Sequence, residues 1–273
     1  MEERKLKVCL VSLNQKFEDR IANKEKVENI LDHVRKYKLD LIIFPEMTLT
    51  GYSLNTELSE LWEDSENLKF FIDQSKKNDI SIIFGISVKE KSSYKNRACF
   101  VDNNGNVLGF YDKIHPFSYT GEDKIFKGGS DLCFIKYKNF NIALTICYDL
   151  RFPEIYSLLS KKADILVNIA NWPSKRLEHW KTLLKARAIE NQVFMIGVNR
   201  SGEDPYNEYQ NSSFLIHPSG DIEKPIISEE GIDIYEIDSF VLEKYRNSFP
   251  TYKDKKPELY YKFYKEVCDA LER

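Results

Sequence analysis

The sequence predicts an α/β protein in which mixed β-sheets lie under layers of helices. Three observations carry this prediction. Apolar strand patterns alternate with helical patterns along nearly the whole chain, two hairpin turns occur among the strands, and no low-complexity linker divides the 273 residues. Alternating strands and helices imply sheets covered by helices, and hairpins add antiparallel strand pairs to them. A chain of this length can bury one sizeable core.

The first half of the chain contains three kinds of local signal. Residues 24–38 carry apolar side chains at helical spacing, and the apolar run LDLIIF at 39–44 is typical of a strand covered on both faces. Asn103-Asn104-Gly105 is a hairpin turn signal. These patterns predict strands at 7–13, 39–44, 80–88, 97–102 and 106–112, and helices at 24–38 and 57–77.

The second half repeats the alternation. The turn signal Pro218-Ser219-Gly220 predicts a second hairpin. Strands are expected at 140–146, 164–169, 193–199, 214–217, 221–223 and 231–237, and helices at 153–160 and 174–190. The end of the chain is rich in Lys and Tyr and reads as an extended arm that finishes in a short helix. We therefore expect one domain over 1–248 and an arm over 249–273 at an oligomer interface.

The composition excludes several classes of function. The 40 Lys and Arg nearly balance the 43 Asp and Glu, which argues against nucleic acid or an anionic membrane as an obligate partner. The five Cys and four His have no CxxC, HxH or HExxH spacing, so we expect no disulfide framework and no metal site. The N-terminal segment is a poor signal peptide and no apolar run could span a bilayer, which predicts a cytoplasmic protein.

Three reactive side chains stand where apolar strand patterns stop. Glu46 follows four apolar residues and Pro45, which fixes the backbone before the carboxylate. Lys113 ends a strand among aromatic residues, and Cys147 follows the strand 140–146 shortly before a helix. Such a strand–turn–helix elbow exposes a nucleophile and points backbone N–H groups at the reacting atom. Each residue also has a structural interpretation, as a surface Glu, a solvated Lys or a small core Cys.

A Cys nucleophile usually needs a base, so a papain-like Cys–His pair is an alternative. His115 and His217 each precede a proline in a turn-like setting. His33 and His179 lie on expected helices. None of the four has the sequence context of a cysteine protease, which makes the Cys–His pair the weaker hypothesis.

Several sequence blocks resemble the signatures of the nitrilase superfamily of carbon–nitrogen hydrolases. The first three occur in the family's order and at similar spacing, which is far more specific than any one block. The resemblance covers about residues 7–237 and leaves out the C-terminal arm. The blocks are FPEMTLTGY (44–52), YDKIHPF (111–117) and ICYDLRFPEIY (146–156), followed by ANWPSKRLEHW (170–180), KARAIENQ (185–192), GVNRSGED (197–204) and FLIHPSGDI (214–222).

The resemblance implies a four-layer αββα sandwich and a homodimer or higher homo-oligomer. It maps Glu46, Lys113 and Cys147 onto the family's catalytic triad and Glu122 onto a fourth site glutamate. In the mechanism it implies, Cys147 attacks the amide carbonyl, and Lys113 with the backbone N–H of Tyr148 stabilises the oxyanion. Glu46 moves the protons and activates water. Neither a metal nor an organic cofactor is needed.

Within the superfamily, the segment CYDLRFPE…ANWP…R…HW most resembles the omega-amidase group, which releases ammonia from short dicarboxylic monoamides such as alpha-ketoglutaramate and succinamate. An Arg could hold the free carboxylate of such a substrate through two hydrogen bonds. The candidate substrate-binding residues are Arg151 and Arg176, with Trp172, Tyr52 and Phe117 as pocket walls.

Three alternatives stay open. The protein could be a broader aliphatic amidase, a hydrolase of N-carbamoyl compounds or deaminated glutathione, or a catalytically silent binding or assembly protein that keeps the fold. Nitrile hydrolysis is disfavoured, because the block around Cys147 reads CYDLRFPE instead of a nitrilase-type CWE.

Overall fold

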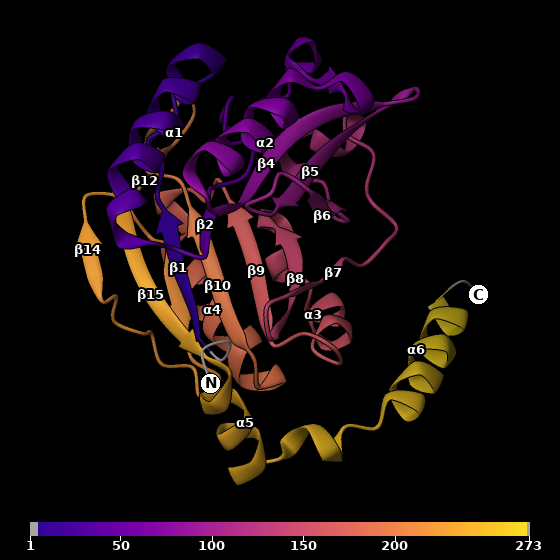
Figure 1. Cartoon of the computed structure of the whole chain (residues 1–273). Helices are drawn as coiled ribbons and strands as arrows, with labels where there is room; N and C mark the ends of the chain where they lie inside the picture. Colours follow the sequence, from indigo (N-terminus) through magenta and orange to yellow (C-terminus); the bar gives the residue numbers. More distant parts are fainter. Residues whose placement is uncertain (1–4, 272–273) are drawn as a thin grey trace.

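Two β-sheets packed face to face form the centre of the protein, and helices cover both outer faces (Figure 1). The computed structural model describes residues 5–271. The apolar layer between the sheets joins Leu10 and Ile43 of one sheet to Leu144 and Val198 of the other. Two further apolar clusters fill the space between each sheet and its helices. The order of layers is helix, sheet, sheet, helix, as the αββα prediction required.

The larger sheet has mixed strand directions. Its strands β1, β2 and β4 are parallel to one another, and the pairs toward both edges are antiparallel. The order is β14 (Ile227–Glu229), β15 (Ile232–Asp238), β1 (Lys5–Val11), β2 (Leu41–Ile43), β4 (Ser81–Glu90), β5 (Ser93–Val101) and β6 (Val107–Asp112), with β3 (Glu60–Leu61) paired to β4.

The smaller sheet has three parallel central strands between two antiparallel edge strands. Its order is β13 (Phe214–Ile216), β10 (Phe194–Asn199), β9 (Ile165–Ala170), β8 (Phe140–Ile146) and β7 (Phe134–Tyr137), and a separate hairpin joins β11 (Gly202–Glu203) to β12 (Glu208–Tyr209). The parallel strands of both sheets end at the same edge of the sandwich, the upper edge in Figure 1. Carboxyl ends of parallel strands are where α/β proteins gather their reactive groups.

The helices lie outside the two sheets. Phe71 of the helix α2 stacks on Phe84 of β4, with ring centroids 3.8 Å apart, which ties this helix to the larger sheet. The α-helices are α1 (Arg20–Val34), α2 (Glu66–Asn78), α3 (Pro153–Leu159), α4 (Leu177–Asn191), α5 (Ser239–Ser248) and α6 (Pro257–Leu271). Short 3₁₀ segments are Arg35–Tyr37, Thr56–Leu58, Trp62–Asp64, Ser118–Thr120, Glu122–Lys124, Cys147–Arg151, Ser174–Arg176 and Thr251–Asp254.

The expected helix over 57–77 is wrong in its first part. The chain there forms a 3₁₀ turn, the short strand β3 and a second 3₁₀ turn before α2 begins. Ser65 caps α2 by accepting a hydrogen bond from Leu68 N, and the carboxylate of Glu60 accepts from Asn67 N. These caps begin a new helix at Glu66, and the Ser65 cap is a local start signal that helical spacing does not contain. The tertiary contact at this place is the pairing of β3 with β4. The expected strand at 221–223 is reduced to one bridge between residues 216 and 222.

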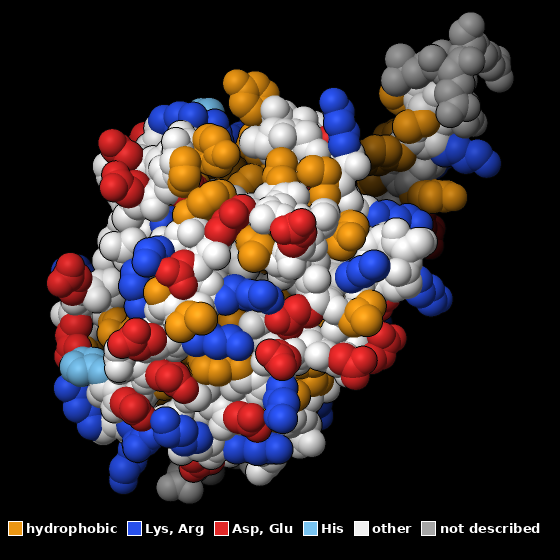
Figure 2. Space-filling model, turned by 90° about the horizontal axis from the view of Figure 1, so that it is seen from above, with side chains coloured by type: hydrophobic (Ala, Val, Ile, Leu, Met, Phe, Trp, Pro, Cys, Tyr) orange, Lys and Arg blue, Asp and Glu red, His pale blue; other side chains and the backbone are white. Residues whose placement is uncertain are grey.

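The end of the chain leaves the body of the protein. Residues near its start are attached, since Gln192 Nε2 donates to Phe249 O (2.5 Å) and Lys255 Nζ donates to Asn191 Oδ1 (2.8 Å). Figure 1 and Figure 2 show α6 projecting outward, and hydrophobic side chains lie along it in Figure 2. The first four residues of the expected domain (1–4) and the last two of the expected arm (272–273) lie outside the described residues.

Charged side chains of both signs are interspersed over the face seen in Figure 2, in keeping with the balanced composition. Within residues 5–271, no helix is long and apolar enough to cross a membrane.

Candidate active site

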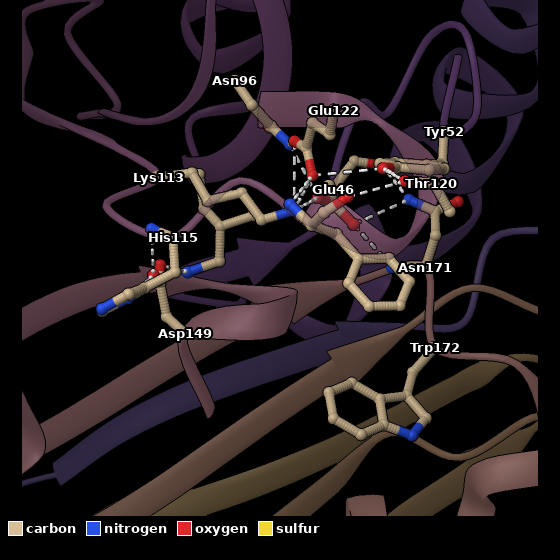
Figure 3. A network of polar contacts seen from close by, with 12 residues as sticks. Glu46, Tyr52, Asn96, Lys113, His115, Thr120, Glu122, Asp149, Asn171 and Trp172 are labelled. Carbon is tan, nitrogen blue, oxygen red and sulfur yellow. Dashed lines mark hydrogen bonds and ion pairs between the residues drawn. The ribbon is translucent and has the colours of Figure 1, made fainter. Parts of the chain in front are cut away.

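A cavity of about 560 Å³ opens where the parallel strands of the two sheets end. Cys147 and Lys113 lie in its wall, and aromatic and cationic side chains line the rest. Glu46 and Glu122 are fully buried behind Lys113 and hydrogen-bond its ammonium (Figure 3). The four residues predicted from the sequence thus meet at one place.

Glu46 follows β2 and is held by an unusually close approach of its loop to β4. The backbone N–H of Thr48 donates to Gly85 O (2.8 Å), and Gly85 N donates to Thr48 Oγ1 (3.1 Å). Gln15 Nε2 donates to the carbonyl oxygens of Glu46 and Met47 (3.1 and 2.8 Å). A Cβ atom at Gly85 would lie 2.5 Å from Met47 N and 2.8 Å from Glu46 Cα, so only glycine fits beneath this loop.

We predict that Gly85→Ala displaces the Glu46 loop and lowers kcat/KM by about a hundredfold, the usual effect of a shift near 1 Å in a reacting group. The control is Gly109→Ala, because the atoms nearest to an added Cβ there belong to the side chains of Ile135 and Cys133 and not to the Glu46 loop. Steady-state kinetics of both variants check the prediction. Equal activity of Gly85→Ala and wild type would contradict it.

Lys113 joins the two carboxylates. Its Nζ lies 3.0 Å from Glu46 Oε1 and 2.8 Å from Glu122 Oε2, and its side chain is buried. The backbone is fixed on both sides, since Lys113 N donates to Asn96 O and Gly129 N donates to Lys113 O (both 2.9 Å). Burial lowers the pKa of Lys113, but the charges of Glu122 and Glu46 outweigh it and raise the pKa well above its ordinary value. Lys113 is therefore a permanent ammonium in the resting site.

Glu122 is surrounded by hydrogen-bond donors. Its Oε2 accepts from Phe117 N (2.6 Å) and from the hydroxyl of Tyr52 (3.1 Å), in addition to Lys113. Burial opposes ionisation, yet Lys113 and a hydrogen bond from Asn96 hold the pKa of Glu122 below its ordinary value. This carboxylate stays ionised and orders the ammonium beside it.

Cys147 begins the turn after β8 with a backbone φ of 44°, a left-handed conformation that a non-glycine residue adopts only under constraint. Asp149 supplies that constraint, because it accepts from Ile146 N (3.0 Å), from the Tyr111 hydroxyl (2.8 Å) and from the backbone N and ring Nδ1 of His115 (3.0 and 2.8 Å). These bonds tie the Cys147 elbow to the segment that carries Lys113.

The Cys147 thiol is neutral at rest. Desolvation raises its pKa well above the ordinary value, and the negative charge of Glu46 raises it further, while Lys113 opposes both. A thiolate therefore forms only as its proton moves to another group.

The four histidines have other partners. His115 bonds Asp149, and His179 Nδ1 lies 3.4 Å from Arg151 Nη2. The remaining two bond Glu229 and Ser219. The geometry therefore favours Glu46 over a histidine as the base for Cys147.

The expected substrate-side residues all line the cavity: Arg151, Trp172, Arg176, Tyr52 and Phe117, together with Tyr148 next to the elbow. The Arg151 guanidinium lies over the Trp172 ring at 4.8 Å, and that of Arg176 lies 5.7 Å from the Phe117 ring centroid. Trp172 Nε1 donates to Arg176 O (2.9 Å), which fixes the indole as a wall.

Two asparagines at the site were not assigned a role from the sequence. The backbone N–H of Asn171 donates to Glu46 Oε2 (2.9 Å), and its Nδ2 donates to Glu46 O (2.7 Å). Asn96 Nδ2 donates to Glu46 Oε1 (2.7 Å) and to Glu122 Oε1 (3.0 Å). Asn96 directly precedes the strand predicted at 97–102, and no pattern around it signals its role. The described residues contain no group of three or more His, Cys, Asp or Glu arranged to hold a metal ion.

Comparison with known proteins identifies the family. The family described as carbon-nitrogen hydrolase matches residues 7–247. The chain is 35% identical to the 2-oxoglutaramate amidase of Bacillus subtilis (87% of this chain, 93% of the relative) and 31% identical to the omega-amidase YafV of Yersinia enterocolitica (91% and 96%). The crystal structure of XC1258 from Xanthomonas campestris, a CN-hydrolase superfamily protein with an arsenic adduct in its active site, matches with a TM-score of 0.85 at 28% identity (92% and 97%). The chain therefore belongs to the carbon-nitrogen hydrolase family and is an enzyme, as the sequence resemblance predicted.

Proposed function

We propose that the protein is an omega-amidase, which releases ammonia from the terminal amide of small carboxylate-bearing amides through a thioester. The observation that carries this proposal is the buried network of Glu46, Lys113 and Glu122 beside Cys147, in a cavity that also holds two arginines. The relatives named omega-amidase and 2-oxoglutaramate amidase support the substrate class, with alpha-ketoglutaramate and succinamate as examples.

In the first half of the reaction, Cys147 gives its proton to Glu46 and its sulfur attacks the amide carbonyl. The carbonyl π bond opens to an oxyanion, which accepts hydrogen bonds from Lys113 Nζ and from the backbone N–H of Tyr148. Loss of one such donor typically raises the barrier by about 3–4 kcal/mol. Glu46 then protonates the amide nitrogen, the C–N bond breaks, and ammonia leaves a thioester on Cys147.

In the second half, Glu46 takes a proton from water as the water oxygen attacks the thioester. The C–S bond breaks and the proton on Glu46 returns to the sulfur. The product leaves as a carboxylic acid, which gives its remaining proton to solvent and becomes the carboxylate. Glu122 stays ionised throughout and orients Lys113. The chain's own side chains thus supply nucleophile, base and oxyanion donors, so the proposal requires no cofactor.

The cationic side of the cavity supports a carboxylate-bearing substrate. Arg151 and Arg176 both line it, and partial burial together with the charge of Arg176 lowers the pKa of Arg151. A carboxylate between the two guanidiniums would relieve this repulsion and accept hydrogen bonds from both. Trp172 and Phe117 keep the guanidiniums in place by stacking beneath them.

We predict that Arg151→Gln lowers kcat/KM for succinamate by roughly thirtyfold, the equivalent of about 2 kcal/mol for a lost hydrogen bond to a charged group. The matched control is a neutral amide of similar length, such as butyramide, on which the same variant should keep wild-type activity. An equal loss on both substrates would mean that Arg151 supports the elbow and does not bind a carboxylate.

The test of the proposed function is ammonia release from a panel of succinamate, glutaramate, alpha-ketoglutaramate, glutamine, butyramide, an N-carbamoyl amino acid, deaminated glutathione and a nitrile. Preference for the carboxylate-bearing monoamides supports the proposal. Activity restricted to the neutral amide, the carbamoyl compound or deaminated glutathione would transfer the function to one of those classes. Silence across the panel, combined with a specific protein partner, would support a silent binding protein.

We further propose that the enzyme is a cytoplasmic homodimer or higher homo-oligomer and that residues 249–273 contribute to its interface. The support is the exposed apolar surface of α6, which includes Tyr260, Phe263, Tyr264 and Val267. Such clusters on a projecting helix are usually covered by a partner.

We predict that a chain ending at Lys256 loses this association. It keeps the contacts of residues 249–255 with Asn191 and Gln192, so the body of the protein should fold. Light scattering after gel filtration should give at least twice the 32.1 kDa chain mass for the full protein and a smaller assembly for the shortened one. An unchanged assembly in the shortened chain would exclude the arm from the interface.

A further inference from the structure

The two buried carboxylates share a single amide donor. Asn96 projects from β5 between Glu46 and Glu122 and gives one N–H to Oε1 of each, at 2.7 and 3.0 Å (Figure 3). Its side chain is buried, and its Oδ1 has no hydrogen-bond partner. A flipped amide would set Oδ1 against two carboxylate oxygens, so chemistry fixes the nitrogen where it is.

The side chain of Asn96 is held by its two donors alone. Both donors end on carboxylates that also hydrogen-bond the ammonium of Lys113. The donors of this amide therefore define what it can do at the site.

Counting donors separates the roles of the two carboxylates, since each carboxylate oxygen has two lone-pair positions. Oε1 of Glu46 receives Asn96 Nδ2 (2.7 Å) and Lys113 Nζ (3.0 Å), so both positions are occupied. Both oxygens of Glu122 are likewise filled by donors from Asn96, Lys113, Phe117 and Tyr52.

Oε2 of Glu46 is the exception. It receives the backbone N–H of Asn171 at 2.9 Å, and the other contact, with Asn171 Nδ2, is long at 3.4 Å. That Nδ2 already has a shorter bond to Glu46 O (2.7 Å). One lone pair of Oε2 is therefore available to a proton.

We propose that Asn96 is a positioning residue that keeps Glu46 Oε1 and Glu122 Oε1 free of protons and so confines proton transfer to Glu46 Oε2. This inference rests on the proposed thioester mechanism. The proton taken from the Cys147 thiol, the proton given to the leaving nitrogen and the proton taken from water all pass through this one oxygen. Asn96 does not line the cavity and acts through the two carboxylates that its amide contacts.

Removing the Asn96 donor should change the pH dependence of the reaction. The charged or titratable groups around the amide are Glu46, Glu122, Lys113, Tyr52 and Cys147. The hydrogen bond from Asn96 is one of the interactions that hold the pKa of Glu122 below its ordinary value, so without the amide Glu122 is protonated up to higher pH. The proposed mechanism needs Glu122 ionised to orient Lys113, and the acid limb of the kcat/KM profile should therefore move to higher pH.

The test compares Asn96→Ala with Asn168→Ala. Asn168 is a matched control, because it is buried, donates twice through Nδ2 to Thr145 Oγ1 and Tyr156 OH, and also has an unpartnered Oδ1. For Asn96→Ala we expect kcat to fall about a hundredfold and KM to change less than about threefold. The acid limb of its kcat/KM profile should move to higher pH by about one unit. For Asn168→Ala we expect lower thermal stability with the wild-type acid limb.

Two other variants test the proposal if Asn96→Ala does not fold. Asn96→Ser keeps one donor and should restore part of the activity and of the acid limb. Asn96→Asp keeps the shape but adds a third carboxylate, and should move the acid limb further than the alanine variant does. If the Asn96 variants that fold have the same acid limb in the kcat/KM profile as wild type, the proposal is wrong and the role of Asn96 is structural.

Two further variants in the same assay distinguish an error in the role of Asn96 from an error in the proposed mechanism. Glu46→Gln and Cys147→Ala should both lose turnover. If either retains it, the thioester mechanism is wrong. If both lose it and Asn96→Ala keeps the wild-type profile, only the role of Asn96 is wrong.

Discussion

Cys147→Ala is expected to leave less than about a thousandth of the wild-type kcat on the best substrate of the panel, because no other group at the cavity wall can form the thioester. The fold should persist, since the thiol lies in the cavity wall and its removal leaves the surrounding layers in contact. Ammonia release over several hours measures the residual turnover, and circular dichroism with thermal unfolding verifies the fold.

Cys133→Ala is the matched control, because Cys133 is a buried free thiol of the same core that does not line the cavity. It should keep activity and lose a little stability. Mass spectrometry after a stopped reaction should detect an acyl adduct on the wild-type chain and none on Cys147→Ala. Turnover above about a thousandth of wild type in Cys147→Ala would remove Cys147 from the role of nucleophile.

Much of the fold followed from local pattern. The strand predicted at 140–146 coincides with β8, and the hairpin turn at Asn103-Asn104-Gly105 joins β5 to β6, with Gly105 at a positive φ of 82°. Both depend on signals contained within a few residues. The helix over 57–77 failed in its first part because residues 60 and 61 pair with β4, a contact that is made only in the folded chain. The helix begins at the Ser65 cap, a local signal that helical spacing does not contain.

The site was predictable to the extent that each group ends a strand. Glu46, Lys113 and Cys147 could be expected near one another because each follows the carboxyl end of a strand, where α/β proteins gather their reactive groups. In the structure, two of these strands belong to the larger sheet and one to the smaller, and all three end at the same edge of the sandwich. The donors that define their protonation could not be expected there, because Asn96 comes from the middle of an antiparallel strand and Asn171 acts partly through its backbone N–H. Backbone donors have no sequence signature, and a single asparagine in a strand has many other uses.

The close packing beneath Glu46 is a second feature of the site that the sequence does not predict. Nothing in the sequence around Gly85 signals that its missing Cβ makes room for the loop of another strand. The role of this glycine depends on a contact between β4 and a loop almost forty residues earlier. Sequence pattern predicts which side chains react, and this assignment stays a prediction. The three-dimensional contacts decide how far each of these side chains can move.

Lys113→Met is expected to affect stability and activity together. Methionine fills a similar volume without charge, so Glu46 and Glu122 would remain buried with no cation between them. Removing one partner of a buried ion pair typically lowers the free energy of unfolding by about 3–5 kcal/mol. The loss of an oxyanion donor should in addition lower kcat by about 10²–10³-fold. Urea unfolding and steady-state kinetics measure the two effects, and Lys5→Met, which removes an exposed ion pair with Glu236, is the control for a lost lysine charge.

The pH dependence of this stability loss provides the sharper test. In the wild type, Lys113 and Asn96 hold the pKa of Glu122 below its unfolded value, so this group stabilises the fold above that value and loses its contribution as the pH falls through the folded pKa. Without Lys113, burial dominates and raises the folded pKa above the unfolded one, which is about 4.3 for glutamate. The variant then keeps its stability at low pH and loses it as the pH rises. The difference in the free energy of unfolding between wild type and Lys113→Met should therefore be smaller at pH 5 than at pH 8. If the difference in the free energy of unfolding is constant or grows on acidification, the lysine fills space and does not balance the charges of the buried carboxylates.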